Sequence, residues 1–333
     1  MISVVGDYMK KAVGMGEIMI QMNPTGKGAL KYQTVFERHV AGSEANIIIQ
    51  MQRLGIQTSF ITSVGDDQFG EIISSTLRAE GTNTSGVKVD PDHPTGIYFV
   101  QRSYPVPNKT KVFYYRKGSA ASFLSSEDIN ESLFENTDLF LVSGITPALS
   151  EKCMNAALKA IEICERKRIK IAFDTNIRVN LLQNAQKALE VLSVFIQKAQ
   201  ILFTGTGDLS FLFGSDFTDN IKSMSKIAKN AELLVIKKGE EGALCLDLSS
   251  GKKFEHPSYP VEVIDELGAG DAFDGAFLAG ILKGHSIEQN LKYGCAAGAM
   301  TVSLKGDIEP LPSWKDLELF IETFETNDEK LLR

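Results

Sequence analysis

A glycine-rich segment near residue 270 carries the clearest chemical signal in this sequence. Asp265-Glu266-Leu267-Gly268-Ala269-Gly270-Asp271 follows a β-branched stretch, 261–264, and precedes a run of small and apolar residues, 272–279. We expect a strand that turns through the glycines into a helix, which leaves the first N–H groups of the helix free to bind a phosphate. The N–H groups concerned are those of Gly268, Ala269 and Gly270.

Asp271 places a carboxylate where an anion should bind. Such a carboxylate is costly beside a phosphate unless it takes part in the reaction, most simply as the base that removes a proton from an attacking hydroxyl. The segment therefore predicts phosphoryl transfer to an alcohol, with the N–H groups holding the transferring phosphoryl group as an oxyanion site does. The alternative is an ordinary tight turn, in which Asp271 is a first-turn charge that favours the helix dipole.

A second glycine-led turn lies near the other end of the sequence. The run Val40-Ala41-Gly42-Ser43-Glu44-Ala45-Asn46 opens an apolar-faced helix that ends at Gly55. The glycine permits close approach of a ligand to the backbone, and the Asn46 amide can hydrogen-bond hydroxyl groups. An ordinary helix N-cap is the alternative, and the residues alone leave the choice open.

These two turns together resemble the hallmarks of the ribokinase-like sugar kinase family. The family has a glycine-led turn ending in Asn near the N-terminus and a Gly-Ala-Gly-Asp loop near the C-terminus, here about 225 residues apart. The resemblance runs from about residue 13 to residue 320 and is strongest to the 2-keto-3-deoxygluconate kinases. Five separated segments carry this closer match in the same order: 39–44, 95–99, 114–120, 174–178 and 306–307.

The resemblance implies an ATP-dependent kinase with an α/β fold. The expected architecture is a three-layer α/β/α domain with a central, mostly parallel sheet and a small projecting β-sheet lid. ATP and Mg²⁺ are the implied cofactors, and phosphates, water and one or two carboxylates usually hold the metal. The implied sugar-binding residues are Gly42, Ser43, Glu44, Ala45, Asn46, Tyr98, Tyr114, Tyr115, Arg116, Arg178, Asp271 and Asp307.

Two strand-like segments bear on the chemistry of the substrate. Tyr114 and Arg116 share one face of the expected strand 112–116, and Tyr98 belongs to the other lid strand. Two phenols and a guanidinium directed at one place suit a carboxylate, which Arg binds bidentately and which a neutral sugar lacks. The alternative for Arg116 is a solvated charge on an edge strand. Arg178 could serve the same carboxylate or the γ-phosphate.

The predicted reaction is phosphorylation of 2-keto-3-deoxygluconate on its C6 hydroxyl, giving 2-keto-3-deoxy-6-phosphogluconate. Whether the galactonate epimer is also used stays open, because the two sugar acids differ at one hydroxyl. One alternative is a kinase of a neutral sugar or nucleoside, of the fructokinase or ribokinase type. Another is a regulator that binds a sugar acid and has lost catalysis, although the intact loop with Asp271 argues against it.

The nucleotide is expected at the segment 236–243, which resembles the strand–loop–strand that lies against ATP in the family. Without the resemblance a plain hairpin turn is favoured. Small residues in the expected helix 291–304 suit either the adenine, as the resemblance implies, or tight helix packing. The implied ATP-binding residues are Asn176, Arg178, Lys237, Gly239, Glu240, Gly242, Gly268, Ala269 and Gly270.

Two positions depart from the family pattern. The family usually has Asn-x-x-Glu before the nucleotide region, to organise Mg²⁺ and its waters. Gly205 replaces the Asn here and Asp208 replaces the Glu, so Asp208 is the candidate metal ligand, acting through water. The second departure is Glu266-Leu267, where small or hydroxylated residues are common, and it could change cation use.

Composition excludes several classes of partner and location. The 333 residues are 43% apolar and 23% charged with a net charge of −7, which argues against nucleic acid and anionic membranes as partners. No apolar run approaches a membrane span and no secretory signal is evident. The four cysteines show no disulfide or zinc spacing, so we expect buried free thiols and a cytoplasmic protein. Residues 1–8 precede the point where family members begin.

Alternation of β-rich and helical segments predicts βαβ units and a parallel sheet covered on both faces. Two stretches, 18–40 and 87–118, lack helical periodicity and are the candidates for the lid. The large domain is then formed by 9–17, 41–86 and 119–325. A lid suits this chemistry because phosphoryl transfer to a sugar must exclude water. An acidic end after Phe324 is expected to fray.

Strand alternation also predicts assembly. If Tyr98, Tyr114 and Arg116 face the substrate, then Ile97, Phe99, Phe113 and Tyr115 face away from it. An exposed apolar face of this kind usually marks an interface. We therefore expect a symmetric homodimer through the lids, which could build into a larger even-numbered assembly. The alternative is that the stretch 18–40 folds over this face within one chain.

Overall fold

A nine-stranded sheet forms the centre of the molecule in the computed structural model, which describes residues 9–107 and 109–326. The strand order is β13-β12-β11-β10-β9-β8-β1-β4-β5, and every neighbouring pair from β5 to β11 is parallel. The strands are β1 (Lys11–Met15), β4 (Gln57–Gly65), β5 (Asn83–Asp90), β8 (Leu139–Ser143), β9 (Lys170–Asp174), β10 (Ile201–Gly205), β11 (Leu233–Lys237), β12 (Ala243–Asp247) and β13 (Lys253–His256). The expected N-terminal extension, 1–8, lies outside the described residues.

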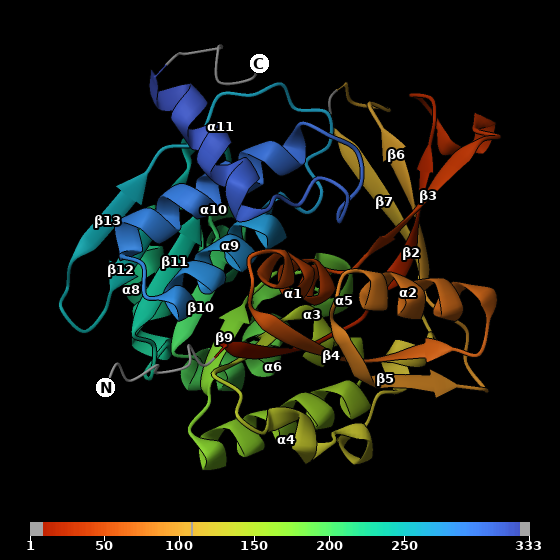
Figure 1. Cartoon of the computed structure of the whole chain (residues 1–333), viewed down its shortest axis with the longest axis horizontal. Coiled ribbons are helices and arrows are strands. Elements are labelled where there is room, and N and C mark those ends of the chain that lie inside the picture. Colours follow the sequence, from red (N-terminus) through yellow and green to blue (C-terminus); the bar gives the residue numbers. More distant parts are fainter. Residues whose placement is uncertain (1–8, 108, 327–333) are drawn as a thin grey trace, which may run out of the picture.

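Helices cover both faces of this sheet (Figure 1). One hydrophobic core contains residues of α1 (Ser43–Arg53), α2 (Gln68–Ala79), α9 (Ala269–Lys283), α10 (Ile287–Val302) and α11 (Trp314–Thr326). The other contains residues of α3 (Ile145–Leu149), α4 (Glu151–Lys167), α5 (Val179–Leu182), α6 (Ala185–Lys198), α7 (Thr206–Phe213) and α8 (Phe217–Ile227). Strand residues alternate between the cores, as Ala12 and Val13 do. The predicted three-layer α/β/α architecture is confirmed.

Short 3₁₀ helices complete the described elements. They are η1 (Leu30–Tyr32), η2 (Ala120–Phe123), η3 (Ser126–Asp128), η4 (Glu131–Phe134) and η5 (Gly239–Glu241).

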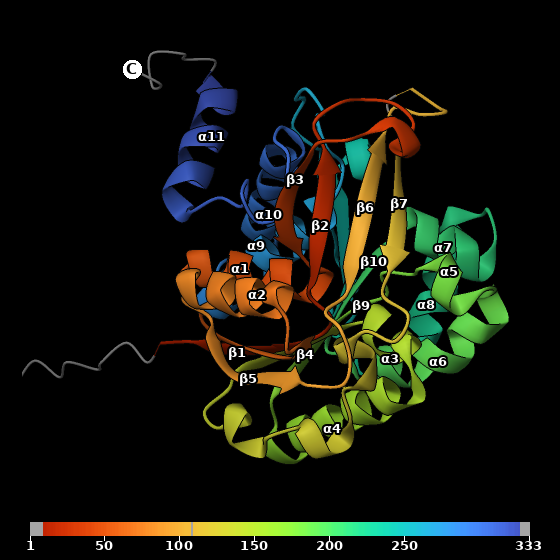
Figure 2. The same ribbon diagram turned by 90° about the vertical axis from the view of Figure 1, so that its right-hand side faces the viewer.

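A second, four-stranded sheet stands on the edge of the large one (Figure 2). Its order is β3-β2-β6-β7, with β2 parallel to β6 and the other two pairs antiparallel. The strands are β2 (Met19–Pro24), β3 (Phe36–Ala41), β6 (Ile97–Arg102) and β7 (Thr110–Tyr115). This is the expected small projecting sheet, formed from both of the predicted stretches, and we refer to it as the lid.

Two sequence expectations about individual elements are wrong. The second lid stretch does not begin at 87, because Val87 pairs with Thr62 within β5 of the large sheet. Residues 261–264 form no strand, since the N–H groups of Ile264 and Asp265 donate to Val302 O at the end of α10 instead of to a neighbouring strand. Of the acidic end that is expected to fray after Phe324, residues 325–326 belong to α11 and the rest lies outside the described residues.

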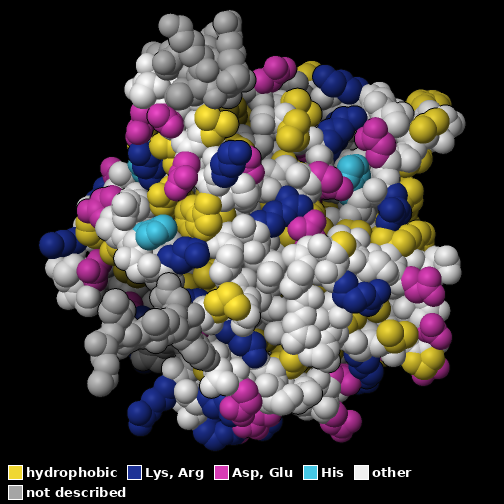
Figure 3. Space-filling view, in the orientation of Figure 1, with side chains coloured by type: hydrophobic (Ala, Val, Ile, Leu, Met, Phe, Trp, Pro, Cys, Tyr) yellow, Lys and Arg dark blue, Asp and Glu magenta, His cyan; other side chains and the backbone are white. Residues whose placement is uncertain are grey.

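Charges are interspersed on the face shown in Figure 3, where basic and acidic side chains alternate with apolar ones. Among the described residues, no helix combines the length and the apolar character needed to cross a bilayer.

Close packing brings the N-termini of α1 and α9 together. A Cβ on Gly42, the N-cap of α1, would lie 2.3 Å from the carbonyl oxygen of Glu17, so only glycine fits between α1 and the segment that leads into β2. Farther along, α1 packs directly against Gly275 of α9, whose Cβ would lie 2.6 Å from the Cβ of Gln50. The two predicted glycine-led turns therefore meet at one place.

Candidate active site

The N-terminus of α9 is open. Gly268 is its N-cap with φ of +78°, a left-handed conformation that favours glycine, and no side chain caps the helix. The first N–H groups of the helix, beginning at Ala269, are therefore available to an anion, and the helix dipole favours one there. The open helix N-terminus agrees with the turn that the Gly-Ala-Gly segment predicted, and phosphate binding there stays a prediction.

Asp271 lies in the first turn of α9 and is held by two residues of α1. Ser43 Oγ donates to Asp271 Oδ1 (2.7 Å), and Asn46 Nδ2 donates to Asp271 Oδ2 (2.8 Å). Burial raises the pKa of Asp271, while these hydrogen bonds and the charges of Lys237 and Arg178 act against the rise. The carboxylate is thus fixed in orientation beside the anion site, as a general base requires.

A second carboxyl group, Asp307, shares the Asn46 amide. Asn46 Nδ2 donates to Asp307 Oδ2 (3.2 Å), and Gln21 Nε2 of β2 donates to Asp307 Oδ1 (2.9 Å). Burial, with the charges of Asp271 and Asp265, raises the pKa of Asp307 to about 7. This carboxyl group therefore changes charge near neutral pH.

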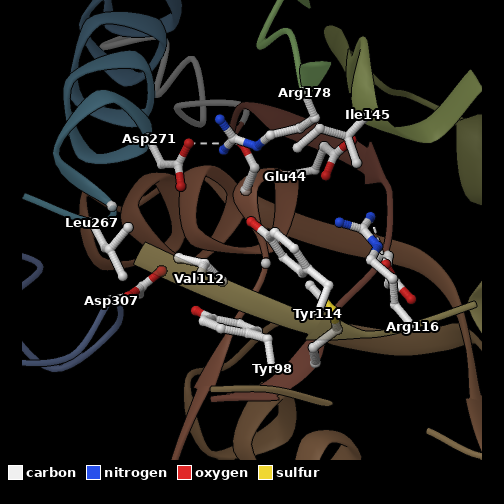
Figure 4. Close-up of a pocket in the computed structure, with 15 residues that line it drawn as sticks. Glu44, Tyr98, Val112, Tyr114, Arg116, Ile145, Arg178, Leu267, Asp271 and Asp307 are labelled. Carbon is white, nitrogen blue, oxygen red and sulfur yellow. Dashed lines mark hydrogen bonds and ion pairs between the residues drawn. The ribbon is translucent and has the colours of Figure 1, made fainter. Parts of the chain in front are cut away.

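These groups line a cavity between the lid and the large sheet (Figure 4). Figure 4 shows Asp271 and Arg178 from the large domain and Tyr98, Tyr114 and Arg116 from the lid around one space. The residues that line this cavity are Glu17, Met19, Gly42, Ser43, Glu44, Tyr98, Val112, Tyr114, Arg116, Ile145, Arg178, Leu267, Gly268, Asp271 and Asp307.

Arg116 does not stand free in the cavity. Its Nη2 forms an ion pair with Glu17 Oε2 (2.6 Å), and its guanidinium lies 5.1 Å from the ring centroid of Tyr114. Burial raises the pKa of Glu17, and the charge of Arg116 opposes the rise. Arg178 also lines the cavity and forms no ion pair with any of the residues that the structure describes. The two guanidiniums therefore differ in how much charge they offer a ligand.

Several predicted sugar-binding residues do not line this cavity. Ala45 is fully buried in the core, and Tyr115 is 67% exposed on the opposite face of the lid, because strand alternation turns it away from Tyr114. Asn46 is committed to Asp271 and Asp307. Asn176, predicted to bind ATP, donates to Ser43 Oγ and so supports the same carboxylate.

A second cavity, of about 630 Å³, begins on the other side of the α9 N-terminus. Predicted nucleotide-binding residues line it: Lys237, Gly239, Glu240, Gly242, Ala269 and Gly270. Its far wall includes Gly294, Gly298 and Ala299, the small residues of α10. Because Gly268 and Asp271 line the first cavity, the two cavities meet at the glycine-rich loop. Arg178 does not line this second cavity.

Lys237 lies at the end of β11 where the second cavity reaches the loop. Its Nζ contacts Asp174 Oδ2 (2.9 Å) and Asp274 Oδ2 (2.8 Å). Burial lowers the pKa of Lys237, but the charges of the two aspartates outweigh that effect and raise it, so the ammonium stays protonated. A fixed positive charge is thus held beside Gly270, where a phosphate would bind.

Asp208, the candidate metal ligand, has protein partners. Its Oδ2 accepts hydrogen bonds from Thr175 Oγ1 (2.6 Å) and the N–H of Ile177 (3.2 Å), and it lines neither cavity. Within the described ranges, no three His, Cys, Asp or Glu side chains are grouped to hold a metal ion. The four cysteines are free and buried, as expected.

Sequence reasoning missed Glu17, Gln21, Arg102 and Asp274. Gln21 shares a strand face with Asn23, and both are fully buried although they alternate with the apolar Ile20 and Met22 in the sequence. Polar residues that alternate with apolar ones in a strand usually predict a solvent-exposed face, so this pattern did not predict that Gln21 and Asn23 are buried. Asp274 could have been found, because it lies one turn after Asp271 in an otherwise apolar helix.

Comparison with known proteins assigns the family. Residues 9–314 match the pfkB family carbohydrate kinases. The chain is 40% identical over 316 residues to 2-dehydro-3-deoxygluconokinase from Thermoproteus tenax, with 94% of each chain covered. It is 30% identical over 318 residues to 5-dehydro-2-deoxygluconokinase from Halalkalibacterium halodurans, covering 94% and 95%. A putative ribokinase II from E. coli, solved with ATP and Mg²⁺, matches with a TM-score of 0.86 at 27% identity, covering 94% of this chain and 99% of that one.

The chain therefore belongs to the pfkB family of carbohydrate kinases and is an ATP-dependent phosphotransferase. The site described above lies where the two cavities meet, at the glycine-rich loop.

We expect Asp307→Asn to alter thermal stability in a pH-dependent way. The pKa of Asp307 rises from 3.8 to about 7 on folding, so this group lowers the free energy of unfolding as pH rises between those values. The variant does not lose this stability. The difference Tm(variant) minus Tm(wild type), measured by scanning calorimetry, should therefore be larger at pH 8 than at pH 5, by about 2 °C or more.

Asp316→Asn is the control for this measurement. Hydrogen bonds from Ser313 hold the pKa of Asp316 below its ordinary value, so the group does not titrate between pH 5 and 8. Its Tm difference should be equal at the two pH values. An equal difference for Asp307→Asn as well would contradict the raised pKa.

Proposed function

We propose that this protein phosphorylates 2-keto-3-deoxygluconate on its C6 hydroxyl, using ATP with Mg²⁺. The product is 2-keto-3-deoxy-6-phosphogluconate, an intermediate of sugar-acid breakdown of the Entner–Doudoroff type. The observation that carries the proposal is that two guanidiniums, Arg116 and Arg178, line the same cavity as the base Asp271. The 40% identity to 2-dehydro-3-deoxygluconokinase, which acts on the same compound under another name, supports it.

Asp271 is the base in the proposed mechanism. It takes the proton of the C6 hydroxyl as the oxygen attacks the γ-phosphorus, and the bond from that phosphorus to the ADP oxygen breaks. Ser43 and Asn46 orient the carboxylate, and the first N–H groups of α9 hold the transferring phosphoryl group. Lys237 contributes its fixed charge from the nucleotide side. Mg²⁺, when bound with the phosphates, neutralises their charge.

Recognition of the substrate carboxylate falls to the lid and to Arg178. Tyr98 and Tyr114 supply phenol groups, and burial keeps the pKa of Tyr98 well above its ordinary value, so that it stays a neutral donor. Glu17 neutralises part of the charge on Arg116, which leaves Arg178 as the less compensated cation. Tyr115 is not part of this proposal.

Two other functions remain to be distinguished. A kinase of a neutral sugar or nucleoside would have the same fold, and a fructokinase is 29% identical to this chain. The second function, binding of a sugar acid without catalysis, is disfavoured by the open helix N-terminus beside a held carboxylate. The galactonate epimer is a further candidate substrate.

We also propose that the protein forms a homodimer through its lids and acts in the cytoplasm. Phe36, Phe99, Phe113 and Tyr115 form an aromatic lid face, within which the rings of Phe99 and Tyr115 lie 5.6 Å apart. The first lid stretch lies in the same sheet and so adds no covering layer, although Ile97 packs against the main core. An interface is the usual reason for such a face. Four buried free thiols suit a reducing compartment.

The first test is a coupled ADP-release assay over sugars and sugar acids. We expect 2-keto-3-deoxygluconate to have the highest kcat/KM, above fructose and ribose. Arg116→Leu should raise KM for the sugar acid roughly 10- to 150-fold, the equivalent of about 1.5–3 kcal/mol, with little change in KM for ATP.

The variant Arg116→Leu with Glu17→Gln serves as its control, because it leaves no buried carboxylate without a partner. It should show the same rise in KM with a Tm close to wild type. A preference of the wild-type enzyme for a neutral sugar would refute the carboxylate assignment whatever the variants do.

Asp271→Asn should reduce kcat by at least ~10²- to 10⁴-fold, the usual contribution of a positioned general base. Binding of MgATP, measured by calorimetry, should change little, because the nucleotide cavity is left intact. Asp247→Asn, at the last residue of β12, is the matched control and should keep full turnover. If Asp271→Asn kept more than about a tenth of wild-type turnover, Asp271 could not be the general base.

For the dimer, light scattering on a sizing column should give twice the monomer mass at micromolar concentration. Phe113→Asp should yield monomers, because it would bury an unpaired charge in the interface. Val89→Asp, at an exposed position on β5, should leave the dimer intact. A wild-type monomer would disprove the assembly.

A further inference from the structure

Arg102, the last residue of β6, joins the lid to the phosphate-binding loop. Its Nη2 forms a buried ion pair with Asp265 Oδ2 and also donates to Asn23 Oδ1 of β2 (2.7 Å). The side chain is 9% exposed and that of Asp265 is fully buried. The guanidinium thus binds two lid strands and the loop at once.

Asp265 is placed to control the shape of that loop. Its Oδ1 accepts a hydrogen bond from the N–H of Leu267 (3.2 Å), the residue before the N-cap Gly268. Its own N–H donates to Val302 O at the end of α10 (3.1 Å). A shift of Asp265 would therefore move the point at which the chain enters α9.

A second set of contacts leads from Arg102 to the base. Asn23 Nδ2 donates to Gln21 Oε1 (2.7 Å), and Gln21 Nε2 donates to Asp307 Oδ1 (2.9 Å). Asn46 then links Asp307 to Asp271, through the two hydrogen bonds described above. Arg102, Asn23, Gln21, Asp307 and Asn46 are all buried, and Asp271 at the end of the chain is partly buried, so water has little access to these hydrogen bonds.

We propose that Arg102 is a positioning residue through which the lid fixes the phosphate-binding loop and the orientation of Asp271. The proposal rests on the role of Asp271 proposed above. It goes beyond that role, because Arg102 lines neither the sugar cavity nor the nucleotide cavity.

The consequence is a link between sugar binding and catalysis. Tyr98, which lines the sugar cavity, lies on the same strand as Arg102 and accepts a hydrogen bond from Gln21 Nε2 (2.8 Å). A sugar held under the lid therefore contacts the same sheet that holds the loop. The loop residues Ala269 and Gly270 also line the nucleotide cavity, but the residues that line it from β11 and η5 have no part in this chain. Arg102 should therefore affect kcat much more than nucleotide binding.

The test compares three variants of the full chain with the preferred sugar and MgATP. Arg102→Met with Asp265→Asn removes both charges, leaves neither unpaired, and keeps an oxygen able to accept from the N–H of Leu267. Arg102→Lys keeps the charge beside Asp265 but cannot bind Asn23 in the same geometry. Arg53→Met with Glu80→Gln is the control, because it removes a partly buried ion pair (2.7 Å) away from the loop.

We expect the Arg102/Asp265 double variant to keep the wild-type KM for MgATP within about threefold and to lose about 30- to 100-fold in kcat, as a small misplacement of reacting groups can cause. Turnover is expressed per folded molecule, with Tm measured alongside. Arg102→Lys should fall between this variant and wild type. The Arg53/Glu80 control should lose Tm without losing kcat.

A well-folded double variant with wild-type kcat would overturn the proposal and make the ion pair purely structural. If the double variant does not fold, Arg102→Lys decides: a wild-type kcat overturns the proposal, and a kcat reduced about fivefold or more at unchanged Tm supports it. The readout needs no particular sugar, so a wrong substrate assignment leaves it valid. Failure of the base itself is detected separately, by Asp271→Asn.

Discussion

The proposed mechanism requires a carboxylate that stays ionised and fixed, partly buried, beside the N-terminus of α9, and most of the site can be explained by that requirement. Burial opposes ionisation of Asp271, so hydrogen bonds from Ser43 and Asn46 and two nearby positive charges must offset it. Both hydrogen-bond donors come from the first turn of α1. The α1 N-terminus therefore has to approach the α9 N-terminus closely. Gly275 lets the two helices pack together, and Gly42 lets the start of α1 lie against the backbone of Glu17.

The same requirement explains how an acidic protein handles anions. Asp265, Asp271 and Asp307 lie near one another, and the structure gives each a different means of compensation. Asp265 has the guanidinium of Arg102, Asp271 has two neutral donors and more distant cations, and Asp307 keeps its proton up to about pH 7. The charge that can be offered to phosphates is thus supplied by single residues placed in the site, although the whole chain carries −7.

Much of the fold and of the reaction centre could be predicted because the signals are local. The Gly-Ala-Gly-Asp loop, the turn at 42–46 and the alternation of strands and helices depend on neighbouring residues, and the structure has all three. Residues 261–264 were misassigned because β-branched residues also suit an extended segment whose N–H groups bond to a helix end. Asn46 lies at the expected place, but its partners come from 225 and 261 residues away, beyond any local pattern.

The lid shows most clearly why the remaining contacts could not be predicted. Its strands carry polar residues on one face and aromatic residues on the other. This pattern normally predicts that the polar face is exposed to solvent and the aromatic face is buried. Here Gln21 and Asn23 are buried and Tyr115 is exposed, so the usual orientation is reversed. The reversal has a physical cause: the polar face closes over carboxylates that need hydrogen-bond donors. The polar residues must be buried because the lid lies over Asp265, Asp271 and Asp307. That position depends on tertiary structure, so the sequence pattern of the strands does not predict it.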